Sequence, residues 1–180
     1  MTSRPSGTAT EARSVSRRRR VLIAGVAVLA VLVAVSVVGV SSGWFGGDDR
    51  QDVVAARGAR VMPFDLEATT HRFVPNAQGG LQSVVADVPS DREQVALIQQ
   101  HLQEEAAALQ RGDFGDPAQI HGADMPGLAA LQAGAGRIDV EYRPRDDGAE
   151  LTYTTDDPVL VAALRDWFAA QISDHGQHAE

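Results

Sequence analysis

Residues 137–155 read RIDVEYRPRDDGAELTYTT, and this stretch decides the fold. Apolar residues occupy every second position within each half, and they are Ile138, Val140, Tyr142, Leu151 and Tyr153. Such alternation is typical of a strand that buries one face and exposes the other. Residues 146–148, Asp-Asp-Gly, predict a tight turn between the two halves. The stretch therefore predicts an antiparallel hairpin with strands at 137–143 and 150–155, one face of which needs a covering layer.

A helix is predicted directly after this hairpin. Asp157 is a favourable N-cap residue, and Pro158 suits the first helical position. Apolar residues then recur at helical spacing: Leu160, Val161, Leu164, Trp167, Phe168 and Ile172. We therefore expect a helix whose broad apolar face packs on the hairpin.

The same order of hairpin and helix occurs earlier in the chain. Residues 68–76 and 81–88 predict two strands joined by a turn at Gly79-Gly80, and period two places His71 and Phe73 on one face. A capping box from Ser90 to Glu93 predicts a helix that ends near Arg111, before Gly112. Its apolar stripe comprises Val95, Ile98, Leu102, Ala106 and Leu109.

Two hairpins and two helices in this order predict an α+β fold. We expect a two-layer sandwich, with a four-stranded antiparallel sheet and two helices on one face. Residues 63–176 form this predicted domain, and 177–180 are expected to be a tail. Residues 113–136 are irregular in pattern, apart from a short helix expected at 128–133. The absence of Cys excludes disulfides, thiolate metal sites and a Cys nucleophile.

The chain before the domain predicts a membrane anchor. Residues 21–40 read VLIAGVAVLAVLVAVSVVGV and carry no charge. A helix of this length, rising about 1.5 Å per residue, spans a hydrocarbon core of roughly 30 Å. We therefore predict a transmembrane helix at 21–43, preceded by a disordered basic cytoplasmic tail at 1–20 and followed by a polar linker at 44–62.

Charge gives the expected orientation and partners. Four consecutive arginines at 17–20 favour a cytoplasmic N-terminus, so we expect a single-pass protein of the cell membrane with its domain outside the cytoplasm. A cleaved signal peptide is the alternative, although its apolar region would be shorter. After Val40 the chain has ten Arg against twenty-three Asp plus Glu, a net charge of −13, which argues against nucleic acid as a ligand. The expected partners are the bilayer, through 21–43, and a protein of the cell envelope.

Histidines carry the remaining chemical signal, because no standard catalytic motif occurs. Imidazole is a common ligand of zinc and copper, and thioether suits Cu⁺. His71 is expected to face the helices, His101 lies beside the apolar stripe of the first helix, and His175 ends the second. The hypothesis of a copper or zinc site uses these candidate ligands: His71, His101, His121, Met125 and His175.

Other interpretations stay open. The five candidates also have structural explanations: a bond to a carbonyl, pairing with Glu105, bracing of a loop, filling of the core and favourable charge at a helix end. Two further function classes are an interaction module for an envelope protein and an enzyme with His121 and Asp124 as acid and base.

The segment 112–178 resembles a family of small extracytoplasmic proteins of actinobacterial type. The resemblance rests on four motifs: GDFGDP at 112–117, IHGADMPGL at 120–128, YTTDDP at 153–158 and WFAAQISDHG at 167–176. It extends back through the first helix and His71. It implies an extracytoplasmic domain and implies no particular activity.

Proteins with this resemblance are often labelled aspartate carbamoyltransferase, and the residues disfavour that activity. The enzyme has two α/β domains and more than twice the size of this domain. It binds carbamoyl phosphate with an S-T-R-T loop, which is absent here, whereas this domain is strongly acidic. Its substrate is also a cytoplasmic metabolite, on the other side of the membrane from the predicted domain.

Overall fold

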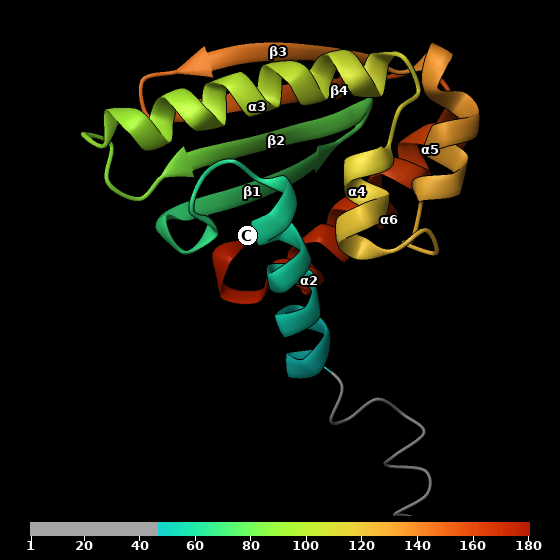
Figure 1. Cartoon of the computed structure of the whole chain (residues 1–180). Helices are drawn as coiled ribbons and strands as arrows, with labels where there is room; N and C mark the ends of the chain where they lie inside the picture. The colour runs from blue at the N-terminus through green and yellow to red at the C-terminus, as the bar shows by residue number, and fades with distance from the viewer. Residues whose placement is uncertain (1–46) are drawn as a thin grey trace, which may run out of the picture. The chain divides into compact units, whose positions relative to one another are not determined.

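The computed structural model describes residues 47–180, which form an α+β domain (Figure 1). The helices are α2 (Gly47–Val61), α3 (Arg92–Gln110), α4 (Gly115–His121), α5 (Leu128–Gly134) and α6 (Pro158–His175). The strands are β1 (Thr69–Asn76), β2 (Gly79–Ala86), β3 (Asp139–Arg145) and β4 (Gly148–Thr154). Single 3-10 turns lie at Leu66–Ala68 (η1), Ala135–Arg137 (η2) and Gly176–His178 (η3).

The four strands form one antiparallel sheet in the order β1-β2-β4-β3. The predicted α+β class and the two predicted hairpins are confirmed. In the register, His71 of β1 pairs with Val84 of β2, which pairs with Ala149 of β4, so all three share the buried face. Helix α3 packs over β3 and β4, whereas α6 packs over β1 and β2 (Figure 1).

The ends of the two long helices follow local sequence. Asp157 caps α6 by accepting a hydrogen bond from the amide of Val159 at 2.8 Å, as predicted. Helix α3 is capped by Asp91 rather than by Ser90, so the predicted capping box is wrong by one residue. The carboxylate of Asp91 accepts a hydrogen bond from the amide of Gln94 at 3.2 Å, which satisfies a free amide of the first turn.

Gly79 and Gly80 begin β2 instead of forming the predicted turn, which lies at Ala77-Gln78. Packing explains the difference. A Cβ on Gly80 would lie 2.3 Å from the ring of Phe168, and one on Gly79 would lie 2.2 Å from the carbonyl oxygen of Tyr153. Only glycine lets helix α6 and strand β4 come this close to the start of β2.

Residues 47–61 form helix α2 where a polar linker was predicted. One face of this helix contacts the domain. The guanidinium of Arg57 donates to the carbonyl of Ile120 at 3.4 Å, and Val54 is only 2% exposed. Composition alone suggested a linker because the helix buries a single apolar side chain, Val54, and its polar contacts are to distant parts of the chain.

The C-terminal residues are also part of the fold. The predicted tail at 177–180 is wrong, because Ala179 pairs with His71 along the outer edge of β1. The amide of Phe73 donates to the carbonyl of Glu180 at 2.8 Å, and the amide of Glu180 donates to the carbonyl of His71 at 3.0 Å. These bonds satisfy backbone groups at the edge of the sheet that β2 leaves free.

The irregular segment holds two short helices. Helix α5 agrees with the predicted helix at 128–133, whereas α4 was not predicted. Gly122, with φ +97°, ends α4 directly after His121. Gly176, with φ +56°, ends α6 directly after His175. Each glycine adopts a backbone conformation that other residues rarely reach, and so fixes a histidine at the last position of a helix.

The predicted transmembrane helix at 21–43 and the basic tail at 1–20 lie outside the described residues. Within 47–180, no helix has both the length and the apolar character needed to cross a bilayer.

Candidate metal centre

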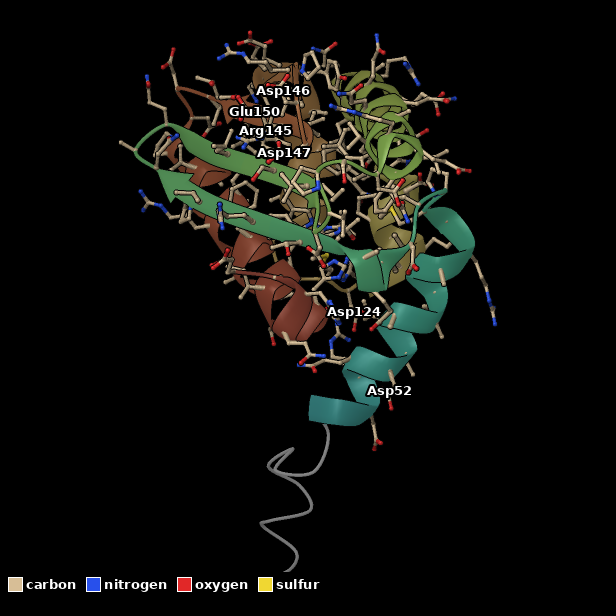
Figure 2. All side chains as sticks on the ribbon, turned by 90° about the vertical axis from the view of Figure 1, so that its left-hand side faces the viewer. Asp52, Asp124, Arg145, Asp146, Asp147 and Glu150 are labelled. Atoms are coloured by element: carbon tan, nitrogen blue, oxygen red, sulfur yellow. The ribbon has the colours of Figure 1, made fainter. Side chains whose placement is uncertain are left out.

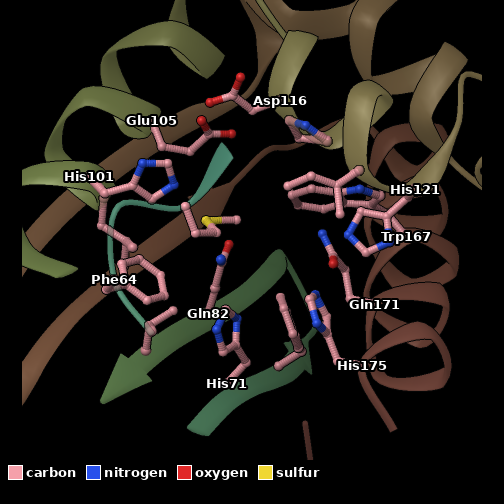
Figure 3. Close-up of a pocket in the computed structure, with 16 residues that line it drawn as sticks. Phe64, His71, Gln82, His101, Glu105, Asp116, His121, Trp167, Gln171 and His175 are labelled. Carbon is pink, nitrogen blue, oxygen red and sulfur yellow. The ribbon is translucent and has the colours of Figure 1, made fainter. Parts of the chain in front are cut away.

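A small pocket lies between α3 and α6 on the buried face of the sheet (Figure 3). Strands β1 and β2 form its floor, and α4 and the segment after α2 close its sides. Its volume is about 40 Å³. The polar lining residues are His71, Gln82, His101, Glu105, Asp116, His121, Gln171 and His175. Four of the five histidines of the chain therefore converge on one space from β1, α3, α4 and α6.

His101, Glu105 and Asp116 form what we call the carboxylate centre, on one side of the pocket (Figure 3). His101 and Glu105 lie four residues apart on α3, so they project from the same side of that helix. Asp116 comes from the first turn of α4. One potential ligand atom from each residue lies within 4.8 Å of the other two. Within residues 47–180, no other three His, Asp or Glu side chains form such a group.

His71, His175 and His121 form what we call the imidazole array, on the opposite side of the pocket. The rings of His71 and His175 stack with centroids 4.9 Å apart and planes at 26°. The ring of His121 meets that of His175 edge to face, with centroids 5.1 Å apart. His175 therefore lies between the other two. Phe64 contacts both sides of the pocket, since its ring centroid lies 6.1 Å from that of His71 and 5.7 Å from that of His101.

A buried carboxylate orients His121. Its Nδ1 lies 2.9 Å from Oδ2 of Asp174. Arg50 of α2 holds the same carboxylate with two hydrogen bonds, from Nε at 2.5 Å and from Nη2 at 2.7 Å. With Nδ1 donating to Asp174, the lone pair of a neutral His121 is on Nε2, which is free to bind a ligand.

Burial keeps the histidines neutral. It lowers the pKa of His71 to about 3, aided by the neighbouring His175 and His101, and it lowers the pKa of His175 to about 4. Burial also lowers the pKa values of His101 and His121, although the bond to Asp174 opposes this for His121. Neutral imidazole is the form that binds metal ions.

The carboxylates respond differently. Burial, together with the nearby Asp116 and Asp113, raises the pKa of Glu105 to about 7. Burial would also raise the pKa of Asp174, but the hydrogen bonds from Arg50 and His121 hold it below its ordinary value. Asp174 is therefore ionised and paired. Among the described residues, by contrast, no cation lies near enough to Glu105 to offset its burial.

Two buried side-chain atoms in the described part of the chain lack a hydrogen-bond partner: Nε2 of His71 and Nε1 of Trp167. Both residues line this pocket. Buried polar atoms in folded proteins nearly always have a partner, so an orphaned atom needs an explanation. A ligand in the pocket, or a water bound to it, would provide one.

The remaining sequence candidates lie elsewhere. Met125 is buried in the hydrophobic core and does not line this pocket, whereas Met62, which was not a candidate, does. Asp124 also lies outside it and His121 pairs with Asp174, so His121 and Asp124 do not form an acid–base pair here. His178 lies 3.4 Å from Glu67.

A second group of acids gathers at the β3–β4 turn, far from Asp52 and Asp124 (Figure 2). Arg145 lies 3.0 Å from the carboxylate of Asp147 and 3.5 Å from that of Glu150, so it offsets part of the negative charge of this group.

Sequence reasoning missed half of the site. Glu105 was noticed only as a partner of His101, and neither Asp116 nor Asp174 was singled out. The spacing of His101 and Glu105 was the available signal, because residues four apart on a helix share one side. Asp116, Asp174 and Arg50 join the site through contacts between distant segments, which no local pattern reveals.

No protein-family model, curated protein or solved structure matches this chain. The chemistry of the pocket is therefore the basis on which function has to be inferred.

Proposed function

We propose that this domain binds a transition-metal ion, zinc or copper, in the four-histidine pocket, with His101, Glu105 and Asp116 as the ligands of a divalent ion. The chain would hold this ion at the outer side of the cell membrane, anchored by residues 21–43. The supporting observation is the mutual approach of three potential ligand atoms to within 4.8 Å. Ligands of a tetrahedral Zn²⁺ lie about 3.3 Å apart, given bonds of about 2.0–2.1 Å. Small side-chain movements would close the difference.

The charge of the carboxylate centre supports a dication. Two carboxylates close to one another repel, and burial makes this repulsion costlier. The raised pKa of Glu105 reflects that cost. A dication placed between Glu105 and Asp116 would cancel both charges and stabilise the ionised form of each.

The size of the pocket supports an ion rather than an organic substrate. A water molecule needs about 10–15 Å³ of such space. The volume of about 40 Å³ therefore accommodates an ion with one or two waters. This volume favours an ion over an organic substrate within this pocket.

The test is a calorimetric titration of the full chain with Zn²⁺ in detergent. We expect saturable binding with a dissociation constant below about 10 μM, which corresponds to a binding free energy of about −7 kcal/mol. Glu105→Gln keeps the size of the side chain and removes a ligand charge, so it should weaken binding at least tenfold. Glu104→Gln is the matched control, because Glu104 is the exposed neighbour on the same helix.

Equal Zn²⁺ affinity in the two variants would refute the assignment of Glu105 as a ligand. Absence of Zn²⁺ and Cu⁺ binding to the wild-type chain would refute the proposed function itself and would favour an envelope-protein partner instead.

A further inference from the structure

The three proposed ligands differ in how firmly the fold holds them. His101 and Glu105 project from α3, a helix of 19 residues whose apolar stripe is buried in the core. Asp116 projects from α4, which has only 7 residues. A helix this short is unstable by itself, because few of its backbone groups find partners within it. The position of Asp116 therefore depends on the contacts that hold α4 in place.

Helix α2 provides such contacts at the C-terminal end of α4. Carbonyl groups in the last turn of a helix have no partner within that helix, and this end carries a partial negative charge. The guanidinium of Arg57 donates to the carbonyl of Ile120 at 3.4 Å, and that of Arg50 donates to the carbonyl of His121 at 3.3 Å. Ile120 and His121 are the last two residues of α4. Two arginines of α2 therefore cap α4 with hydrogen bonds and favourable charge.

Arg50 also holds the side chain at this end of α4. Its Nε and Nη2 donate to the carboxylate of Asp174 at 2.5 Å and 2.7 Å, and that carboxylate lies 2.9 Å from Nδ1 of His121. The last residue of α4 is thus fixed at its carbonyl by Arg50 directly, and at its ring by Arg50 through Asp174. Detachment of α2 would remove the first contact and weaken the second.

The attachment of α2 is itself limited. Among the described side chains of this helix, Val54 is the only buried apolar one, and the guanidinium of Arg50 is about half exposed. Elements with few buried apolar contacts open at a lower free energy than the whole domain. Helix α2 should therefore detach more readily than α3, which carries the other two ligands.

We propose that Arg50 and Arg57 are positioning residues for Asp116, and that detachment of α2 controls how fast the metal ion enters and leaves the carboxylate centre. With α2 attached, Asp116 completes the set of three ligands. With α2 detached, α4 loses its cap and Asp116 moves away, so the ion is held by the two ligands of α3 alone. This inference deepens the proposed function and rests on it for the presence of an ion at the carboxylate centre.

The test follows Co²⁺, as a probe for Zn²⁺, by its visible absorption in stopped flow with the full chain in detergent. Association is measured on mixing with Co²⁺, and release on mixing with excess EDTA. The double variant Arg50→Gln/Arg57→Gln should raise both rates at least tenfold, because the ion passes through the detached form in both directions. The dissociation constant should stay within threefold, because α2 remains attached most of the time. Arg60→Gln, at an exposed position of the same helix, should change neither rate.

Two further variants separate positioning from support of the fold. Arg57→Gln alone keeps the contact between Arg50 and Asp174, and should give a smaller rise in both rates. In an Asp116→Ala background, the two arginine substitutions should change the rates less than twofold, because the ligand that they position is gone. A far-ultraviolet circular dichroism spectrum like that of the wild type would show that each variant is folded.

Three results would overturn this inference and leave the proposed metal centre intact. The first is unchanged rates in the double arginine variant. The second is faster release with unchanged or slower association, which would mean that the arginines only stabilise the bound form. The third is an equal rise in the Asp116→Ala background. Absence of Co²⁺ and Zn²⁺ binding to the wild-type chain would instead refute the proposed function, and this inference with it.

Discussion

Nδ1 of His121 lies 2.9 Å from Oδ2 of Asp174, and the bond joins the last residue of α4 to the last turn of α6. Arg50 adds α2 to the same contact. One carboxylate thus connects three helices and fixes the orientation of a histidine in the pocket. The relationship has a functional side, in the donor that His121 presents, and a structural side, in the helices that it joins.

Asp174→Asn should separate these two sides. The amide no longer carries the charge that pairs with Arg50, so the contact among α2, α4 and α6 should weaken and the free energy of unfolding should fall by about 1–3 kcal/mol. Zn²⁺ affinity at the carboxylate centre should stay within twofold, because Asp174 does not contribute there. Asp166→Asn, at an exposed position of the same helix, is the control. Unchanged stability in urea unfolding would mean that Asp174 does not hold the three helices together, and a loss of Zn²⁺ affinity would show that it also supports the carboxylate centre.

Glu105→Gln should stabilise the metal-free protein while it weakens metal binding. The folded-state pKa of Glu105 is raised from 4.5 to about 7, so its contribution to stability is present below pH 4.5 and is lost as the pH rises through about 7. At pH 8 the substitution should therefore raise the free energy of unfolding by about 1 kcal/mol, and at pH 4.5 it should have little effect. Urea unfolding in EDTA measures this, with Glu104→Gln as the control. A destabilised variant at pH 8 would show that the carboxylate is already satisfied without metal.

His71 and His175 predict a loss of stability in mild acid. Their folded-state pKa values are lowered from 6.5 to about 3 and about 4, so their contribution is present above pH 6.5 and is lost as the pH falls toward those values. Glu105 acts in the opposite direction between about pH 7 and 4.5, and the experiment therefore uses Glu105→Gln as its background.

In that background, the free energy of unfolding without metal should fall steadily from pH 7 to pH 4. Adding His175→Gln should make the fall shallower, since one of the two histidines no longer takes up a proton on unfolding. Urea denaturation at each pH measures the free energy of unfolding, and its slope against pH tests this prediction. An unchanged slope would mean that His175 is solvated in the metal-free protein.

Gly80→Ala should destabilise the fold by about 2 kcal/mol, because a new Cβ would lie 2.3 Å from the ring of Phe168 and 2.9 Å from the carbonyl of Val74. Gly136→Ala is the control, since a Cβ there would meet nothing within 4 Å. Thermal unfolding of both variants gives the comparison. Similar stability of the two would contradict the close packing of α6 on β2.

Much of the fold follows from local pattern. The alternation in 137–155 predicted β3 and β4 because one face of the sheet is solvated, and Asp157-Pro158 predicted the start of α6. Helix α2 was missed because Val54 is its only fully buried apolar side chain, and its polar contacts are made by Gln51 and by arginines that compositional reasoning assigns to solvent. Gly79-Gly80 was misassigned to a turn because glycine is required there by the close approach of Phe168, which is far away in the chain.

The site was predicted by residue type more than by geometry. Histidines stand out in a sequence without catalytic motifs, and four of them do meet in one pocket. Met125 was included for its thioether, but it faces the core. The sequence alone does not distinguish Asp116 and Asp174 from the many other acidic residues of the domain. Asp116 and Asp174 gain their roles only from tertiary contacts with His101 and His121.

X-ray absorption at the zinc edge of the Zn²⁺-loaded full chain tests the central claim most directly. The carboxylate centre predicts a first shell of nitrogen and oxygen at about 2.0–2.1 Å, with outer-shell scattering from a single imidazole. The imidazole scattering should disappear in His101→Gln at equal zinc and remain in Glu104→Gln. A spectrum of oxygen ligands alone in the wild-type chain, or one that His101→Gln leaves unchanged, would contradict a metal centre at His101, Glu105 and Asp116.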